Sequence, residues 1–299
     1  MGVTSVRPPA AWVVVDFDGT CTTADSTGLL PHIAEAHALA APESRTSVFA
    51  RFEAQYVSGV AEIMRSADGA AIAPDVAGLR AFVDELDQFS VSVARQLGET
   101  GCLSGIDDHR VASTLRDFGR EGRAPTLRPG CAEALSALNG AGCRLGVLSV
   151  GWCPPLIDAT LAPPLAACGA GLRLDAVWCN ALSPDGRVIQ RVSGGEAKRA
   201  KIAALRASAA ADSRPEAAER IVYVGDSPTD LPALIEADVG ILIGSSRSAR
   251  QVLRHFGVPI RPLPSKITPR GDGEPALWEA PSWDAIAASL LGRTAGGSR

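Results

Sequence analysis

Residues 12–20 read Trp-Val-Val-Val-Asp-Phe-Asp-Gly-Thr, an apolar run that ends in two aspartates and a glycine. A run of this length that is rich in Val is typical of a parallel strand covered on both faces. Side chains two positions apart in a strand lie on the same face, so Asp16 and Asp18 can both point into one site where this strand ends. The alternative is a simple turn, because Asp and Gly are common turn residues. Two carboxylates at this position require a cation or hydrogen-bond donors to offset their burial.

The same kind of apolar run recurs along the chain, with helical patterns between the runs. The predicted strands are Trp12–Phe17, Arg144–Val150, Ala176–Asn180, Ile221–Gly225 and Val239–Ile243. The predicted helices of this part are Cys131–Asn139, Glu196–Ala207, Asp230–Ala237 and Ser248–Phe256. This alternation predicts an α/β fold in which right-handed crossovers build a doubly wound parallel sheet.

Residues 25–126 interrupt the alternation, because they contain helix-like stretches and no convincing strand. The predicted helices are Leu30–Leu39, Ser47–Met64, Asp75–Leu97 and Asp107–Arg120. We interpret residues 25–126 as a helical cap inserted into an α/β core formed by residues 1–24 and 127–299. Near the C-terminus, the Pro- and Gly-rich stretch Pro262–Glu279 is predicted to be irregular, and Ser282–Leu291 to form a last short helix.

The composition of the 299 residues is that of an ordinary soluble globular protein, with 46% apolar residues, 21% charged residues and a formal net charge of -4. No basic stripe indicates a nucleic-acid partner, and no apolar run reaches the roughly 18 residues of a membrane span. The seven cysteines form no CxxC pair and the histidines show no metal-ligand spacing, so neither a zinc site nor a disulfide framework is indicated. We expect a cytoplasmic protein, without a signal peptide, that acts on a small molecule. The oligomeric state stays open.

A second apolar run also ends in acids, since Ile221–Gly225 leads directly into Asp226 and, four residues later, Asp230. Either aspartate could instead cap the following helix by accepting backbone N–H groups. Two acidic strand ends in one sheet suit a hard cation, and Mg²⁺ prefers one or two carboxylates together with water and phosphate oxygens. The carboxyl ends of strands are also where open α/β sheets bind their ligands.

Two further polar residues are candidates for binding phosphate. Ser149 ends the second core strand, where its hydroxyl and the neighbouring amides could bind a phosphate oxygen. Lys198 lies near the start of a helix, after a Gly-Gly turn, in a chain that otherwise relies on Arg; a lysine there supplies a compact positive charge. Lys201 is the competing candidate, but Ile202 and Leu205 are predicted to face the core, which places Lys201 nearer the outer face.

Taken in order, these motifs resemble those of the haloacid dehalogenase superfamily. The residues that carry the resemblance are Asp16, Asp18, Thr20, Ser149, Lys198, Asp226 and Asp230. The resemblance implies the fold of that superfamily, and the helical insertion is similar to the cap of its phosphoserine phosphatase-like branch. An acid at Asp18 implies phosphomonoester hydrolysis, since the dehalogenases have no acid at that position and the P-type ATPases have Thr.

The resemblance also implies a reaction with a covalent intermediate. Asp16 is expected to attack phosphorus and form an aspartyl phosphate. Asp18 is expected to protonate the leaving oxygen and then to take a proton from the attacking water.

The implied cofactor is Mg²⁺. Its expected binding residues are Asp16, Asp18 through its main-chain carbonyl, Asp226 and Asp230, of which Asp230 would orient a metal-bound water or Lys198. The expected phosphate-binding residues are Ser149, Lys198 and Thr20, and Thr20 would also brace the turn of the first motif.

A closer resemblance covers nearly the whole chain and is to the phosphatase half of plant bifunctional thiamine-phosphate enzymes. The matching segments are Asp16–Thr22, Ser149–Cys153, Val224–Asp230, Glu236–Ile243 and His255–Val258, with a similar tail near Ser282–Trp283. This implies thiamine monophosphate as the substrate. The thiaminase-like activity of the plant enzymes is not expected here, because the chain has no room for that domain.

A thiazolium cation favours aromatic and acidic surroundings. Trp152, Tyr56 and Glu53 are the candidate substrate-binding residues, although the two aromatic residues could equally belong to the core.

Other functions are compatible with the same motifs. Specificity resides in the cap, so the ester could instead be phosphoserine or a nucleotide-like monophosphate. An aspartyl phosphate could also be passed to an alcohol, which would make the protein a phosphotransferase. A non-catalytic binding protein on the same fold is the third alternative, and the complete set of acids argues against it.

Overall fold

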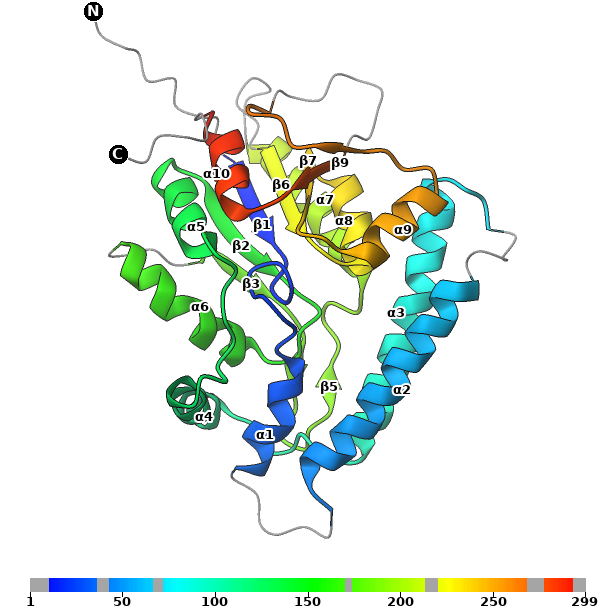
Figure 1. The fold of residues 1–299 in the computed structure, drawn as a ribbon, viewed down its shortest axis with the longest axis vertical. Helices are drawn as coiled ribbons and strands as arrows, with labels where there is room; N and C mark the ends of the chain where they lie inside the picture. The colour runs from blue at the N-terminus through cyan, green and yellow to red at the C-terminus, as the bar shows by residue number, and fades with distance from the viewer. Residues whose placement is uncertain are drawn as a thin grey trace, which may run out of the picture.

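The computed structural model describes residues 11–36, 43–66, 72–169, 174–212, 220–267 and 277–292 (Figure 1). Within these ranges the chain has the predicted α/β fold, a parallel sheet covered by helices on both faces. The predicted helix Leu30–Leu39 is described only as far as Ala36, so its last three residues lie outside the described ranges.

A seven-stranded sheet forms the centre of the molecule, in the order β3-β2-β1-β6-β7-β9-β8. Its strands are β1 (Ala11–Val15), β2 (Arg144–Leu148), β3 (Ala176–Trp178), β6 (Arg220–Gly225), β7 (Val239–Ile243), β8 (Ile260–Pro262) and β9 (Leu277–Ala280). β1 lies between β2 and β6 and pairs in parallel with both. The chain therefore builds first on one side of β1 and later on the other, which makes the carboxyl end of β1 the switch point where such sheets bind ligands.

Helices cover the two faces of this sheet, as the apolar sequence of β1 predicts. One face is covered by α5 (Cys131–Gly140), α6 (Pro154–Cys168) and α10 (Trp283–Leu291), and the other by α7 (Gly195–Asp212), α8 (Leu231–Glu236) and α9 (Arg247–His255). Val13 and Val15 are buried in the first apolar layer, whereas Trp12 and Val14 are buried in the second. All of β1 is therefore removed from solvent.

The regular elements described between residues 25 and 126 are all helical. They are the short 3₁₀ helix η1 (Thr27–Leu29) and the helices α1 (Leu30–Glu35), α2 (Arg45–Ser66), α3 (Val76–Glu99) and α4 (Asp108–Arg120). Figure 1 shows α2 and α3 as a long pair along one side of the molecule. α3 packs against α7 of the core, and α4 packs against α6.

The chain leaves and re-enters the core at neighbouring positions. Thr22 and Leu127 form an isolated antiparallel bridge, and the amide of Thr23 donates to the carbonyl of Thr126 over 2.8 Å. These contacts support our proposed division of the chain into a cap, residues 25–126, and a core.

The structure differs from the prediction at short or unusual elements. α6 was not predicted, because its interior Pro163 and Pro164 remove helical hydrogen bonds and read as helix breakers. The antiparallel pair β4 (Ala181–Leu182) and β5 (Val188–Ile189) is too short to produce a periodic pattern. The prediction that Pro262–Glu279 is irregular is wrong at both ends, where Pro262 closes β8 and Leu277 opens β9; residues 268–276 lie outside the described ranges.

Within the described ranges, no helix has both the length and the apolar composition that a span of a lipid bilayer requires.

Candidate active site

The carboxyl ends of β1 and β6 bring the two acidic motifs together, as the sequence predicts. Carboxylate oxygens of Asp16, Asp226 and Asp230 lie within 4.8 Å of one another. Asp16 continues the pairing of β1 with β6, since its amide donates to the carbonyl of Val224 over 2.9 Å. The site therefore lies at the switch point of the sheet.

The turn after β1 requires the residues that it has. Gly19 has φ +75°, and a Cβ atom at this position would lie 2.5 Å from Oδ2 of Asp226. The Thr20 hydroxyl donates to Oδ1 of Asp226 over 2.9 Å. Trp283 of α10 donates through Nε1 to the carbonyl of Thr20 over 3.0 Å. Thr20 thus connects the turn after β1 to Asp226, and Trp283 of α10 holds the same turn through its backbone.

Lys198 is fully buried and lies between two of the acids. Its Nζ is 2.8 Å from Oδ1 of Asp16 and 2.7 Å from Oδ1 of Asp230. Burial favours the neutral amine, but these two carboxylates raise the pKa of Lys198 above its ordinary value, so it carries its charge. The competing candidate, Lys201, lies instead over the ring of Trp178, at 5.1 Å. Of the two lysines considered from the sequence, only Lys198 reaches the acids.

The oxygens of Asp230 accept hydrogen bonds from several donors. Oδ1 accepts from Lys198 and, over 2.7 Å, from the hydroxyl of the buried Tyr223. Oδ2 accepts from the amides of Asp226 and Ser227 and from the Ser227 hydroxyl. Burial works against ionisation here, yet the Lys198 ammonium and these donors hold the pKa of Asp230 below its ordinary value. Asp230 is therefore a fixed negative charge that is hydrogen-bonded to Lys198.

The site carries more negative charge than Lys198 balances. Burial and the charge of Asp230 raise the pKa of Asp16 well above its ordinary value. The same two causes raise the pKa of Asp226 to about 6. Hard carboxylate oxygens with surplus negative charge are the donor set that Mg²⁺ prefers, so the residues present fit this ion.

The carboxylate of Asp18 has its hydrogen-bond partner outside the cluster of Asp16, Asp226 and Asp230. Its Oδ1 accepts from the amide of Ser26 over 2.8 Å, at the point where the chain leaves the core. Burial, and after it the negative charge of Asp25, raise the pKa of Asp18 to about 7. A carboxyl group with this pKa can both give and take a proton near neutral pH. Asp25 itself is exposed, and its carboxylate accepts from the amide of Thr27 over 2.7 Å.

Ser149 lies at the end of β2, next to the same site. Its Oγ accepts from the amide of Gly151 over 2.9 Å, which leaves the hydroxyl proton available to a ligand. A Cβ atom on Gly151 would lie 3.1 Å from this oxygen and 3.8 Å from Oδ2 of Asp18. The Ser149 hydroxyl and the Asp18 carboxylate therefore both lie next to Gly151.

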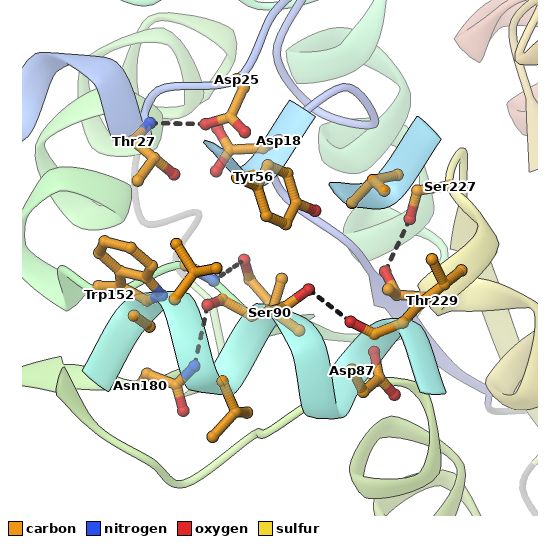
Figure 2. Close-up of a pocket in the computed structure, with 18 of the residues that line it drawn as sticks. Asp18, Asp25, Thr27, Tyr56, Asp87, Ser90, Trp152, Asn180, Ser227 and Thr229 are labelled. Atoms are coloured by element: carbon orange, nitrogen blue, oxygen red, sulfur yellow. Dashed lines mark hydrogen bonds between the residues drawn. The ribbon is translucent and has the colours of Figure 1, made fainter. Parts of the chain in front are cut away.

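A cavity of about 550 Å³ opens from the acids toward the helices of the insert. Figure 2 shows Tyr56 and Trp152 facing this cavity together with Asp18 and Asp25. Glu53 of α2 also lines it. Tyr56 is 40% exposed and stacks on Phe89, with ring centroids 6.3 Å apart. The structure thus brings all three candidate substrate residues to the lining of one cavity, and Tyr56 is not a core residue.

Sequence reasoning missed two acids that line the cavity, Asp25 and Asp87. Asp25 follows the first motif closely, so its position next to the strand end was a usable signal. Asp87 belongs to the buried face of α3, where an acid in an otherwise apolar stripe was the signal.

Residues 11–238 match the model of the haloacid dehalogenase-like hydrolases. The chain belongs to this family. The predicted family and fold are therefore confirmed, and the protein is a hydrolase. In this hydrolase Asp16, Asp226 and Asp230 form one cluster. Asp18 lines the same cavity as Asp16, and its pKa of about 7 allows it to exchange protons near neutral pH.

A curated relative is the "Bifunctional TH2 protein, mitochondrial" of Arabidopsis thaliana, which is 26% identical over 298 residues. The match covers 92% of this chain and 46% of the relative, so the chain spans about half the length of that protein.

Solved structures with a similar fold include a phospho-aspartyl intermediate analogue of phosphoserine phosphatase. The TM-score is 0.46 at 15% identity, with 82% of this chain and 91% of that chain covered. A cytosolic 5'-nucleotidase bound to cytidine matches with a TM-score of 0.48 at 16% identity, covering 84% and 87% of the two chains.

Proposed function

We propose that this hydrolase is a phosphatase that cleaves phosphomonoesters with Asp16 as its nucleophile. The observation that carries the proposal is the buried arrangement in which Lys198 holds Asp16 on one side and Asp230 on the other, next to the separately placed Asp18. Lys198 fixes the direction of the Asp16 carboxylate by donating to its Oδ1. The other carboxylate oxygen of Asp16, Oδ2, does not contact the lysine. A nucleophile, a proton donor and a fixed cation are the groups that such a reaction requires.

The residues divide the reaction into two steps. In the first step an oxygen of Asp16 bonds to phosphorus, the ester P–O bond breaks, and the leaving oxygen takes the proton of Asp18. In the second step water attacks the aspartyl phosphate while Asp18 removes its proton, and the Asp16 carboxylate is released with inorganic phosphate. General acid–base assistance of this kind contributes roughly 10²–10⁴-fold to the rate.

Lys198 and the Ser149 hydroxyl are the groups proposed to hold the phosphoryl oxygens, where charge develops in the transition state. Thr20 is placed at the same turn, with its hydroxyl directed to Asp226, so its contribution is mainly to keep that carboxylate in position. Asp230 acts through Lys198, which it shares with Asp16.

Asp16, Asp226 and the main-chain carbonyl of Asp18 are the groups proposed to hold Mg²⁺, and Asp230 is the fourth acid of this set. When bound, the ion neutralises negative charge on the transferring phosphoryl group and on the acids. The surplus of buried carboxylates over the single buried ammonium supports this proposal.

Thiamine monophosphate is the proposed substrate. The cavity combines aromatic side chains with the acids Asp25 and Glu53. Among the described residues that line it, Lys198 is the only basic side chain, and Asp16 and Asp230 already occupy it. An aromatic cation is favoured by such walls, whereas the carboxylate of phosphoserine would meet no free positive charge there.

The test is phosphate release from thiamine monophosphate, phosphoserine and an aryl phosphate, each with and without Mg²⁺. We expect turnover to require Mg²⁺ and kcat/KM to be highest for thiamine monophosphate. If another ester is preferred, the chemistry stands and the substrate is wrong. If an added alcohol receives the phosphoryl group as a new ester in place of inorganic phosphate, the protein is a phosphotransferase. If the folded protein with Mg²⁺ hydrolyses nothing, the phosphatase proposal fails and a binding role replaces it.

The substitution Asp25→Asn is expected to move the alkaline limb of the pH profile to lower pH. Asp18 must hold a proton to act as the general acid, so kcat/KM falls as pH rises through its pKa of about 7. The negative charge of Asp25 helps to raise that pKa, so its removal lowers the pKa and the fall begins earlier. Asn keeps an oxygen that can accept from Thr27.

The measurement is kcat/KM against pH for wild type and variant, with an ester whose leaving group is a poor one. An activated aryl phosphate, whose leaving group needs no proton, serves as the control and should show a smaller shift. A limb that stays in place or moves to higher pH contradicts the assignment of Asp18 as general acid.

We also propose that the protein is cytoplasmic. The name of the Arabidopsis relative places that protein in mitochondria, and cell fractionation of this protein decides the matter.

A further inference from the structure

The N-terminus of α7 is capped by a side chain from the insert. Oδ2 of Asp87, in the middle of α3, accepts from the amide of Gly195 over 2.6 Å, and Gly195 is the first residue of α7. The first amides of a helix have no partner inside the helix, and a carboxylate is the type of group that satisfies them. Asp87 is only 6% exposed, so this contact is buried.

Two glycines allow α3 to approach α7 this closely. A Cβ atom on Gly194 would lie 2.0 Å from Cγ of Asp87. A Cβ atom on Gly195 would lie 2.7 Å from Cγ1 of Val83, also on α3, and 2.8 Å from the carbonyl oxygen of Thr229. Any larger residue would therefore push α3 away from the start of α7.

The turn that Asp87 holds is the turn that carries Lys198. The amide of Lys198 donates to the carbonyl of Gly194 over 3.0 Å, so its backbone belongs to the first turn of α7. Its Nζ lies between Asp16 and Asp230 with no exposed surface. A displacement of this turn moves the lysine relative to both carboxylates.

A second contact joins the same helices at the surface. Arg80 of α3 donates through Nε and Nη2 to the carboxylate of Glu196 of α7, but both side chains are more than 40% exposed. Salt and solvent screen this exposed pair, whereas the contact of Asp87 is buried and is made to the backbone of the turn itself.

We propose that Asp87 is a positioning residue, which sets the place of Lys198 in the active site by anchoring the first turn of α7 to the cap helix α3. This rests on the proposed phosphatase function, in which Lys198 binds the phosphoryl group. Asp87 acts through its acceptor oxygen, so its contribution is independent of the leaving group of the ester. A residue that contacted the leaving group would instead change the preference among esters.

The test compares Asp87→Ala and Asp87→Asn on thiamine monophosphate and on an aryl phosphate. We expect Asp87→Ala to lower kcat by about tenfold to a hundredfold for both esters alike, with KM little changed, since displacement of a catalytic group by about 1 Å has effects of this size. Asp87→Asn keeps an acceptor oxygen and should retain most of the activity. The matched control is Asp84→Ala, an exposed acid one turn earlier on α3 that accepts from Gln88 and does not line the cavity.

Gly194→Ala is a second variant that leaves the carboxylate in the chain but displaces it from Gly195. It should lower kcat in the same way as Asp87→Ala. Hydrogen exchange of the peptide that contains residues 194–198 reports whether the turn has loosened. We expect faster exchange in Asp87→Ala and Gly194→Ala, and exchange as slow as in the wild type in Asp87→Asn.

Four results would overturn the assignment. They are a loosened turn with unchanged kcat, a loss confined to the cationic ester, an equal loss in Asp84→Ala, and an Asp87→Asn variant as impaired as Asp87→Ala. An inactive wild type defeats the proposed function together with this assignment, whereas an active wild type with any of the four results defeats the role of Asp87 alone.

Discussion

The substitution Asp16→Asn is expected to lower kcat by at least about four orders of magnitude, the size of effect seen when a catalytic nucleophile is removed. The amide cannot bond to phosphorus as the carboxylate does, so no aspartyl phosphate forms. The fold should survive, because Asn has the same shape and Lys198 keeps its contact with Asp230. Removal of one buried negative charge from a site with surplus acids should leave the unfolding temperature equal or higher. The measurements are phosphate release and thermal unfolding of the same preparation.

The control is Asp117→Asn, an exposed acid on α4 that pairs with Arg120, and it should behave as wild type in both assays. Substantial turnover by folded Asp16→Asn protein would exclude Asp16 as the nucleophile.

The substitution Lys198→Met is expected to remove activity and also to destabilise the protein. Met has a similar length but no charge, so Asp16 and Asp230 would be left buried without their ammonium partner. Breaking a buried ion pair by removing one partner costs about 3–5 kcal/mol of unfolding free energy. The measurement is urea unfolding without added metal, at about pH 8 and at about pH 5.

The unfolding free energy of Lys198→Met should depend on pH, because the substitution changes the pKa of Asp230. In the wild type, burial opposes ionisation of Asp230, but Lys198 holds its pKa below the ordinary value, and this stabilising contribution is present above the ordinary pKa of the carboxyl group. Without Lys198, burial would raise that pKa, so the folded variant would bind protons that the unfolded chain releases. The stability of the variant should therefore rise more steeply than that of the wild type as pH falls from about 8 to about 5, since the raised pKa values of Asp18 and Asp226 give both proteins the same direction of change.

Lys201→Met is the matched control, one turn further along α7. Lys201 is partly exposed and lies over Trp178, so its replacement should cost less than about 1 kcal/mol. Equal stability losses in the two variants would show that the buried ion pairs of Lys198 with Asp16 and Asp230 do not stabilise the fold.

The elements that carry the site could be predicted because their signals are local. The strand that precedes Asp16 and the strand that precedes Asp226 are continuous apolar runs, and their ends coincide with the acids. The choice of Lys198 over Lys201 followed from helical periodicity, and the structure places Lys198 against Asp16 and Asp230. In these cases a pattern of a few neighbouring residues determines which way a side chain points.

What the sequence did not reveal depends on contacts between distant segments. β8 and β9 are short strands that exist because β9 pairs with β7 and β8 pairs with β9 at the edge of the sheet. The cap that Asp87 provides for α7 joins positions 108 residues apart. The raised pKa of Asp18 is caused by burial and by Asp25, and neither cause can be read from the strand motif itself.

The measurement that tests the central claim most directly is the search for a phosphoryl group on Asp16. Wild type and Asp18→Asn are mixed with Mg²⁺ and an aryl phosphate, quenched in acid, digested and analysed by mass spectrometry. The account predicts a phosphoryl group on the peptide that contains Asp16, in larger amount in Asp18→Asn, because the second step then lacks the base that activates water. Phosphate release by the wild type with no phosphoryl group on Asp16 in either protein, or with that group on another residue, would contradict it.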